Sequence, residues 1–460
     1  MKNPLPSFLL RFILILVFLG TSVTTFSQTK EVYVELDRKK QEFSIYIEVP
    51  DKGVIVLYLT LDKTTQYNVL FFDENLNEKW KISDISSPKK IVKGFYNNLL
   101  NYGKELINGV VTPDGKYAYI ANIIDDVVYR IDIATGKWEA ISLAKKLIKD
   151  KYGFPRGYTI NFNVDENYYY LSEMGHFLSN SDISKRNKIT VNRIKHGENK
   201  FESFSFSPTP ANGKEKPHRF GADQHSSGDL QQWEVFFIKD NKIILKDNYP
   251  IRKDENNAFY RKMVVYNLEG NILSEANLPM GHTVNYTREY YSGIISYNKN
   301  KDKIYTFTYI NDNEKSGTVL YKCYDLNLKL LWEKTYKIKT DNYSKREHSY
   351  YKEVYHNHDN TISLLTYDGA FTIDSDGSNP NFKKHCIEDN QSYEINCYEF
   401  EKANKLSSSF ILNDYKKLKA LGKQFSINLF KVKDKIIYTI TVDHFAPDAD
   451  FYRLASFDIK

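Results

Sequence analysis

The chain has few cysteines, and their spacing argues against the common structural metal sites. Its three cysteines are Cys323, Cys386 and Cys397, and no CxxC pair is present, so a zinc site built on thiolates is not expected. Cys386 and Cys397 are close enough in sequence to close a short disulfide loop, which would stabilise the chain by constraining its unfolded state. Whether they pair is left open. Cys323 lies in the strand pattern VLYKCYDL and is interpreted as a small buried hydrophobic residue.

The signatures of common enzymes are also missing. No GxSxG turn, HExxH helix or Walker loop is present. TPDGK, residues 112–116, lacks the repeated glycines and the following helix of a phosphate loop and reads as a turn. DSDGSN, residues 374–379, begins like a calcium loop, but His385 stands where the bidentate glutamate would be. We therefore expect no metal and no cofactor.

Clustered basic charge is absent as well. The sequence has 64 Lys and Arg against 58 Asp and Glu, a formal net charge of +6, and the two signs are interspersed. A nucleic-acid-binding surface needs basic residues gathered in a patch. Nucleic acid is therefore not an expected partner.

The prominent hydrophobic run stands at the N-terminus. Basic Lys2 and Arg11 accompany an apolar run from Phe8 to Leu19, which small polar residues follow up to Ser27. This order is typical of a secretory signal peptide, and the run is well short of the roughly 20 residues that span a bilayer. The sequence predicts a signal peptide over residues 1–27 and export of residues 28–460 to the periplasm or the outside of the cell. No transmembrane anchor is expected after cleavage.

What the chain does contain is a repeated strand–turn–strand unit. Four segments can be aligned by eye: NVLFFDENLNEKWKIS from Asn68, DVVYRIDIATGKWEAIS from Asp126, KMVVYNLEGNILSEANL from Lys262 and TVLYKCYDLNLKLLWEKTY from Thr318. Alternating apolar residues and the many aromatic side chains favour β-strands. Because repeats can extend one domain well beyond the usual length, we expect a single domain over residues 28–460.

Two residue types recur in phase within these units. The first strand of each unit ends at Asp73, Asp132, Asn267 and Asp325, and the second strand carries Trp80, Trp138 and Trp332 in three of the four. We expect the tryptophans to share one structural position and to form a packing layer between neighbouring sheets. A ring of aromatic ligand contacts is the alternative, and packing is the simpler explanation.

Weaker copies extend the repeat to the end of the chain. AFTIDSDGSNPNF and FYRLASFDIK place Asp374 and Asp458 in phase, and NKITVNRIKHGENKFESFSF supplies a faint copy between residues 132 and 267. The phased positions lie on average about 64 residues apart, more than the roughly 40 to 50 of a four-stranded propeller blade. The pattern predicts a β-propeller of seven blades with long loops, six and eight being the alternatives.

The two ends of the chain are predicted to complete one blade. SINLFKV, KIIYTITV and YRLASFDI supply three strands near the C-terminus, and KEVYVEL, residues 30–36, supplies the fourth. Pairing the ends removes an exposed sheet edge and closes the ring. Short amphipathic helices are expected only as insertions, over residues 143–153 and 406–424.

These motifs resemble the repeats of several propeller families. TPDGKYAYIAN with VVYRIDIATGKW resembles the YVTN repeat, FTIDSDGSNPNF resembles the PD40 repeat of TolB, and VLYKCYDLNLKLLWEKTY resembles repeats of quinoprotein-like propellers, close to the WD40 type. The resemblance is to the superfamily as a whole. It implies a toroid of radial sheets around a central channel, used for protein docking in some members and for ligands or catalysis in others. The vicinal cysteine pair of enzymatic quinoproteins is absent from this chain.

A group of histidines is the weak candidate for catalysis. HNHD places His356 and His358 on one face if that segment is extended, and PHRFGADQHSSGD contributes His218, Asp223 and His225. If these residues met at a channel mouth, they would form a divalent-metal or general-base site. Polar loop residues in contact with water are the simpler interpretation, because short motifs often occur without function.

The sequence therefore predicts an all-β propeller that acts as an exported binding or scaffold protein and docks a protein partner. The longest interruptions of the repeat, residues 173–188 and 207–229, are where binding residues are sought first, since loops on a rigid scaffold carry most binding function. An enzyme or lectin-like module acting on a glycan or other polar substrate is the alternative.

Overall fold

The described part of the chain consists of β-strands and the turns between them. The computed structural model describes residues 28–35, 41–61, 65–87, 107–123, 125–147, 158–175, 188–209, 233–247, 251–253, 258–282, 293–299, 301–313, 316–339, 353–356, 361–365, 369–384, 425–432, 435–442 and 451–458. These residues contain no helix, and so none that could cross a membrane. The all-β class predicted from the sequence is confirmed over this part of the chain.

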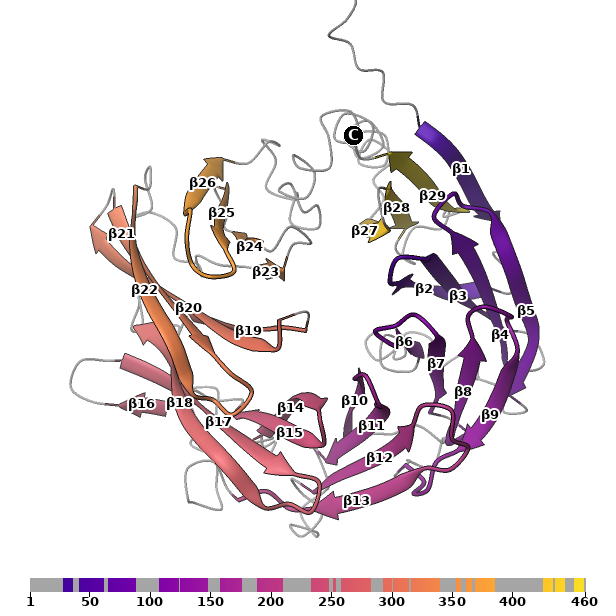
Figure 1. Cartoon of the computed structure of the whole chain (residues 1–460), viewed down its shortest axis with the longest axis horizontal. Helices are drawn as coiled ribbons and strands as arrows, with labels where there is room; N and C mark the ends of the chain where they lie inside the picture. Colours follow the sequence, from indigo (N-terminus) through magenta and orange to yellow (C-terminus); the bar gives the residue numbers. More distant parts are fainter. Residues whose placement is uncertain are drawn as a thin grey trace, which may run out of the picture.

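The described strands form seven antiparallel sheets, here called blades 1 to 7 (Figure 1). Blade 1 contains β2 (Gln41–Val49), β3 (Gly53–Leu61), β4 (Thr65–Asp73) and β5 (Glu78–Ser87). Blade 2 contains β6 (Ile107–Val111), β7 (Tyr117–Asn122), β8 (Val127–Asp132) and β9 (Trp138–Ser142). Blade 3 contains β10 (Tyr158–Val164), β11 (Tyr168–Gly175), β12 (Ile189–Lys195) and β13 (Glu202–Phe206).

The remaining blades follow the same plan, with one additional strand, β16, in blade 4. Blade 4 contains β14 (Trp233–Lys239), β15 (Lys242–Asp247), β16 (Ile251–Lys253), β17 (Ala258–Asn267) and β18 (Ile272–His282). Blade 5 contains β19 (Gly293–Asn298), β20 (Lys303–Asn313), β21 (Ser316–Tyr324) and β22 (Leu330–Lys339). Blade 6 contains β23 (Glu353–His356), β24 (Thr361–Leu365), β25 (Gly369–Asp374) and β26 (Asn381–Lys384). Blade 7 contains β27 (Phe425–Val432), β28 (Lys435–Val442), β29 (Phe451–Asp458) and β1 (Gln28–Glu35).

The blades follow one another around a ring in sequence order, with the first strand of blades 1 to 6 and β27 of blade 7 nearest the centre (Figure 1). The faint repeat copy expected before residue 267 is the β12–β13 hairpin. In blade 7, β1 lies on the outer side of β29, with Val32 opposite Leu454. This arrangement of radial antiparallel sheets is that of a β-propeller.

Apolar side chains hold neighbouring blades together. Because successive side chains of a strand point to opposite faces, Val69 and Phe71 of β4 pack into the core shared with blade 2, whereas Leu70 and Phe72 pack with Ile437 of blade 7. Full burial of such a side chain contributes about 1.5 to 3 kcal/mol. Blade 1 is therefore stabilised by both of its neighbours.

The phased acidic residues close the turn between the third and fourth strands. Asp73 Oδ1 accepts hydrogen bonds from the backbone N–H groups of Asn75 and Asn77, both at 2.9 Å, and Asp325 Oδ1 does the same for Asn327 and Lys329 at 2.9 Å. Burial opposes ionisation of Asp73, but hydrogen bonds from Asn77, Asn75 and Lys79 outweigh it and hold the pKa of the carboxyl below its ordinary value. These residues stabilise local turn structure.

A left-handed residue recurs in the same turns. Leu76, Gly136, Gly270, Leu328 and Gly377 have φ between +55° and +87°. Such values favour glycine, because a Cβ is strained there. Leu76 and Leu328 accept them and bury their side chains in the cores beside the turn.

The tryptophans pack between blades, but they do not all share one position. Trp80 and Trp332 follow a β-bulge and face the next blade. Trp80 Nε1 donates to Ile133 O at 2.8 Å, and the Trp332 indole lies against Gly377. Trp138 faces the preceding blade instead, and its Nε1 donates to Asp84 Oδ1 of blade 1 at 3.1 Å. The expectation of a common position is wrong for Trp138, because the bulge that shifts register by one residue is missing from the β8–β9 pair.

The helix expected over residues 143–153 does not begin where its pattern starts. Residues 143–147 form a bend. The backbone N–H of Leu143 donates to Asp126 O at 2.9 Å, and that of Leu147 donates to Asp126 Oδ1 at 2.9 Å. Lys145 N–H donates to Asn192 Oδ1 of blade 3 at 3.0 Å. Tertiary acceptors thus take the N–H groups that would start a helix. The second expected helix, residues 406–424, lies outside the described residues.

Candidate functional site

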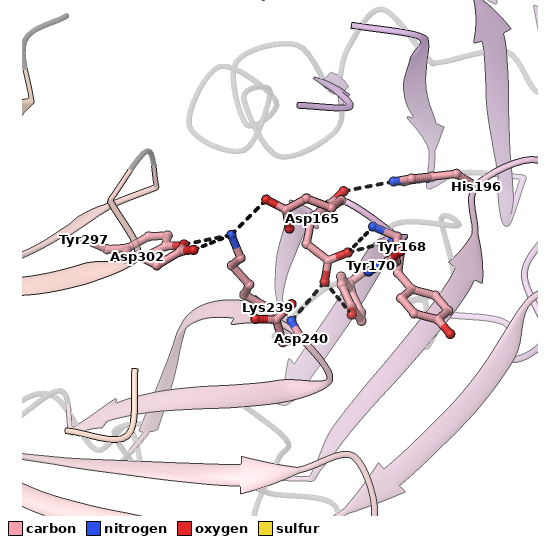
Figure 2. A network of polar contacts seen from close by, with 10 residues as sticks. Asp165, Tyr168, Tyr170, His196, Lys239, Asp240, Tyr297 and Asp302 are labelled. Carbon is pink, nitrogen blue, oxygen red and sulfur yellow. Dashed lines mark hydrogen bonds and ion pairs between the residues drawn. The ribbon is translucent and has the colours of Figure 1, made fainter. Parts of the chain in front are cut away.

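A network of polar side chains joins blades 3, 4 and 5 (Figure 2). Its members stand at the turns between the first and second strands, with Asp165 from blade 3, Lys239 and Asp240 from blade 4, and Asp302 from blade 5. The blade 4 turn has φ of +50° at Asp240 and +60° at Asn241, a left-handed pair typical of a two-residue hairpin turn, in which Asp and Asn are tolerated.

Asp165 is the buried anchor of this network. Its side chain is buried, and its Oδ1 accepts from the backbone N–H groups of Asn167 at 2.8 Å and Tyr168 at 2.7 Å. Its Oδ2 accepts from the Tyr170 hydroxyl at 2.8 Å and from the backbone N–H of Asp240 at 2.9 Å. These four hydrogen bonds occupy the acceptor sites of the carboxylate. Asp165 therefore ties blade 3 to blade 4 and has no acceptor site left for a metal or a substrate.

Lys239 spans the same three blades. Its Nζ lies 2.7 Å from Asp302 Oδ1 of blade 5 and 3.2 Å from Glu166 Oε1 of blade 3. Burial alone would lower the pKa of Lys239, but its hydrogen bonds to Asp302 and Glu166 raise it above the ordinary value. The ammonium group is thus held charged as a tie between turns.

Asp240 stands in the blade 4 turn, next to the charges of this network. Burial first, and then the charge of Asp165, raise the pKa of its carboxyl, although its side chain is exposed. The charges of Glu166 and Asp302 also raise this pKa, and they and Asp165 outweigh the opposing charge of Lys239.

Two arginines extend the ties to blades 2 and 3. Arg130 and Arg193 pair across the sheet with Glu139 and Glu202. Arg130 Nη2 also donates to Asn199 Oδ1 of blade 3 at 2.9 Å, and Arg193 Nη1 donates to Asn241 Oδ1 of blade 4 at 2.6 Å. This arrangement was not predicted from the sequence, although a signal for it was present. In both blades a tyrosine, Tyr117 or Tyr168, begins the second strand, and its ring lies against the guanidinium.

His196 belongs to the same set of ties. Its Nδ1 lies 2.9 Å from the Tyr119 hydroxyl of blade 2, and its Nε2 lies 2.9 Å from Asp165 O. Donation by Tyr119 to Nδ1 and by the Nε2–H group to the carbonyl satisfies both ring nitrogens. The polar residues described at these turns therefore bind one another, which indicates a structural role.

Only one of the five candidate residues for catalysis lies in the described part of the chain. His218, Asp223, His225 and His358 lie outside the described residues, and His356 alone is described. His356 Nε2 lies 2.7 Å from Ser296 Oγ of blade 5. Burial lowers the pKa of His356 to about 4, so this ring is neutral at pH 7 and is a weak base. In the part of the chain that the structure describes, no three His, Cys, Asp or Glu residues are grouped as metal ligands.

The oxygen-rich stretches are turns that bond to themselves. Thr112 Oγ1 accepts from the backbone N–H groups of Lys116 at 3.1 Å and Tyr117 at 3.0 Å. Asp374 Oδ2 accepts from Ser378 Oγ at 3.1 Å and from Asn379 Nδ2 at 2.6 Å. Both stretches are therefore turns, as the sequence predicted.

One of the three cysteines lies in the described part of the chain. Cys323 is buried and free, and burial raises the pKa of its thiol to about 11, so it is inert at neutral pH. Cys386 and Cys397 lie outside the described residues.

Exposed apolar residues set blades 4 and 5 apart. Ile272, Leu273, Leu330 and Leu331 are the large hydrophobic residues exposed in the described part of the chain, with exposed fractions of 43% to 49%. Each pair begins the outer strand of its blade, β18 or β22. A β-bulge at each pair leaves Leu273 and Leu331 without a cross-strand partner, so both members of a pair face outwards. We call these four residues the apolar rim pairs.

Blade 1 has the same bulge with different residues. Glu78 pairs with Phe72, and Lys79 is the extra residue without a cross-strand partner. Both side chains are exposed, and Lys79 Nζ lies 3.3 Å from Asp73 Oδ2. Charged residues are thus compatible with this turn and bulge in blade 1. The apolar side chains in blades 4 and 5 are therefore not required by the local fold.

Comparison with known proteins supplies no family. No family model matches the chain, and no curated protein sequence matches it. Among solved structures, the chain is similar to the WD40 domain of SCAP from fission yeast, with 8% identity, 93% of this chain and 98% of that chain covered, and a TM-score of 0.32. It is also similar to the Cps50 (Swd1) β-propeller domain of Myceliophteria thermophila, with 7% identity, 91% and 100% covered, and a TM-score of 0.35.

A bacterial structure is similar to the same degree. It is a member of the DUF4221 family from Bacteroides vulgatus, with 12% identity, 78% of this chain and 95% of that chain covered, and a TM-score of 0.30. Scores of this size carry no conclusion about activity or partner.

Proposed function

We propose that this propeller is an exported binding or scaffold protein and that the apolar rim pairs are its docking surface for a protein. Export rests on the signal-peptide pattern of residues 1–27. We also propose that the seven sheets are the full set of blades and that pairing of β1 with β29 closes the ring.

The apolar rim pairs carry the proposal. Single exposed apolar residues are common on proteins, but here an exposed pair recurs at the matching position of two neighbouring blades, and a partner that spans both blades would cover both pairs. Covering about half of a leucine side chain stabilises a complex by roughly 1 kcal/mol. The polar residues of the neighbouring turns already bind one another, so apolar contact is the interaction that these blades offer.

The test exchanges the pairs for the residues that the chain itself uses in blade 1. The variant carries Ile272→Glu, Leu273→Lys, Leu330→Glu and Leu331→Lys. We expect crosslinked affinity isolation from intact cells to recover a stoichiometric protein with the parent chain and to lose it with this variant.

A control places one glutamate and one lysine on other blades. Ala140→Glu and Ser203→Lys change exposed positions on the outer strands of blades 2 and 3 and should leave the recovered protein unchanged. Equal recovery with the parent chain and the blade 4 and 5 variant would contradict the proposed docking surface.

A further inference from the structure

One row of side chains crosses blade 5 and faces blade 6. Ser296 of β19 lies opposite Tyr305 of β20, which in turn lies opposite Cys323 of β21. Side chains that lie opposite one another share a face of the sheet. Tyr305 and Cys323 belong to the apolar core that also contains Ile362 of blade 6. The row therefore forms the blade 5 side of the contact between these two blades.

His356 of blade 6 binds the inner end of this row. It is the last residue of β23, which lies beside β19 on the inner side of the ring (Figure 1), and its Nε2 lies 2.7 Å from Ser296 Oγ. Its ring also lies against Tyr305, with 5.7 Å between the ring centroids. His356 Nδ1 is buried and has no hydrogen-bond partner in the described part of the chain. The ring is therefore joined to blade 5 through Nε2.

A proton on His356 would place an uncompensated charge in this contact. The charged ring carries an N–H group on both nitrogens, and the one at Nδ1 would be buried without an acceptor. The titratable groups on the facing side of blade 5 are neutral. Burial raises the pKa of Tyr305 and of Tyr321, and it raises the pKa of the Cys323 thiol to about 11. They offer no negative charge to the ring below pH 9.

The charged residues around this contact do not compensate the ring either. Asp376 of blade 6 and Lys303 and Asp325 of blade 5 act on the tyrosines or the thiol of this face. The pKa of His356 responds to burial, which lowers it from 6.5 to about 4. The folded state thus holds this proton less tightly than the unfolded state does. Stability is therefore lost as the pH falls from 6.5 towards 4.

We propose that the contact between blades 5 and 6 is an acid-sensitive switch, in which protonation of His356 releases Ser296 and separates β23 from β19. At neutral pH the ring is uncharged and the two blades are joined. In mildly acidic solution the charged ring is stable where water reaches it, so the blades part and the row that contains Cys323 becomes accessible. This inference concerns the ring of blades and does not depend on the docking surface proposed above.

Cys323 can report this opening, because its thiol is free and only 1% exposed in the closed contact. The full chain is treated with 4,4′-dithiodipyridine, which labels thiols at acidic as well as neutral pH. Digestion and mass spectrometry then measure the labelling of Cys323 apart from that of Cys386 and Cys397. Each rate is divided by the rate for a VLYKCYDL peptide at the same pH, so that the reactivity of the thiol itself cancels.

We expect the corrected labelling rate of Cys323 to rise roughly 25-fold between pH 7.5 and pH 5, the effect of one proton on a group whose pKa is 6.5 when open and about 4 when closed. His356→Gln keeps an amide that can bind Ser296 but takes up no proton, so its rate should stay constant over this range. His196→Gln removes a histidine from the contact between blades 2 and 3 and should leave the rise at Cys323 intact.

Circular dichroism is recorded at each pH to separate opening from unfolding of the whole chain. A parent rate that is the same at pH 7.5 and pH 5 overturns the inference, as does an equal rise in the His356→Gln variant. A rise that coincides with loss of the strand signal overturns it too. If the variant does not fold, the parent profile decides. The rate should then increase close to tenfold per pH unit between about 6 and 4.5, and a rise confined to lower pH, where carboxylates take up protons, contradicts the switch.

Discussion

Gly136 shows how a single residue fixes the contact between two blades. It has φ of +70°, and a Cβ at this position would lie 2.8 Å from Trp80 Cγ of blade 1. Gly197 occupies the corresponding turn of blade 3 with φ of +86°, where the nearest atom to a Cβ would be the Tyr117 hydroxyl at 4.0 Å. The two glycines share backbone strain, and only Gly136 adds a steric clash.

Alanine substitutions at the two glycines therefore distinguish the cost of backbone strain from the cost of the clash with Trp80. Gly197→Ala should destabilise the protein by about 1 kcal/mol, the cost of a left-handed alanine. Gly136→Ala should cost about 3 kcal/mol, because the Trp80 indole must also move and its contacts are lost. The midpoints of denaturant unfolding measure the difference, and equal shifts for the two variants would show that the contact with Trp80 carries no weight.

Asp240 should make the protein less stable at neutral pH. Its pKa is raised in the folded state, so the folded state holds the proton more tightly than the unfolded state does. Stability is then lost as the pH rises from the unfolded pKa of about 3.9 through the raised folded value.

Asp240→Asn keeps a residue that tolerates φ of +50° and removes the charge. We expect it to stabilise the protein at pH 7 by about 0.5 kcal/mol, the size of a solvent-screened charge interaction. The gain should vanish as the pH falls to about 4. Asp51→Asn, at another left-handed turn position with φ of +56°, reports the effect of the exchange itself. A gain that is independent of pH would exclude charge as its origin.

At the scale of the element, the strand and turn pattern could be predicted because its causes are local. Apolar alternation marked β4, β8, β17 and β21, and the phased acidic residues marked their turns. The bulge could not be predicted, because it depends on how one strand registers against its neighbour. The sequence therefore aligns Trp138 with Trp80, although Trp138 contacts the preceding blade and Trp80 contacts the following one.

The apolar rim pairs were hidden from the sequence for the same reason. NILSEANL and LLWEKTY read as ordinary strands with alternating burial, and the bulge alone exposes both residues of each pair. Similarly, Asp165 and Lys239 belong to different repeats, and their ties depend on how neighbouring blades pack.

The bulge also predicts how the blade 1 exchange behaves in the isolated protein. Glu-Lys is accepted at the bulge of blade 1, where both side chains reach water. The exchange in blades 4 and 5 should therefore leave the melting temperature within about 2 °C, as surface substitutions usually do. A fall of about 10 °C would show that the apolar side chains serve the fold of the single molecule.

At the scale of the whole molecule, the ring presents the apolar rim pairs on a rigid frame. The polar ties of Arg130, Arg193 and Lys239 link blades 2 to 5 by turn contacts, in addition to the apolar cores between neighbouring blades. Turn contacts and apolar cores together restrict the movement of β18 relative to β22. The protein therefore loses little conformational entropy when a partner binds.

Photo-crosslinking from single positions tests the docking surface most directly. A photoreactive amino acid is placed at position 273, at position 331, or at position 79 as the equivalent bulge residue of blade 1, and intact cells that produce the protein are irradiated. We expect defined protein crosslinks from positions 273 and 331 and only background from position 79. Equal yields from all three positions would contradict a docking surface on blades 4 and 5.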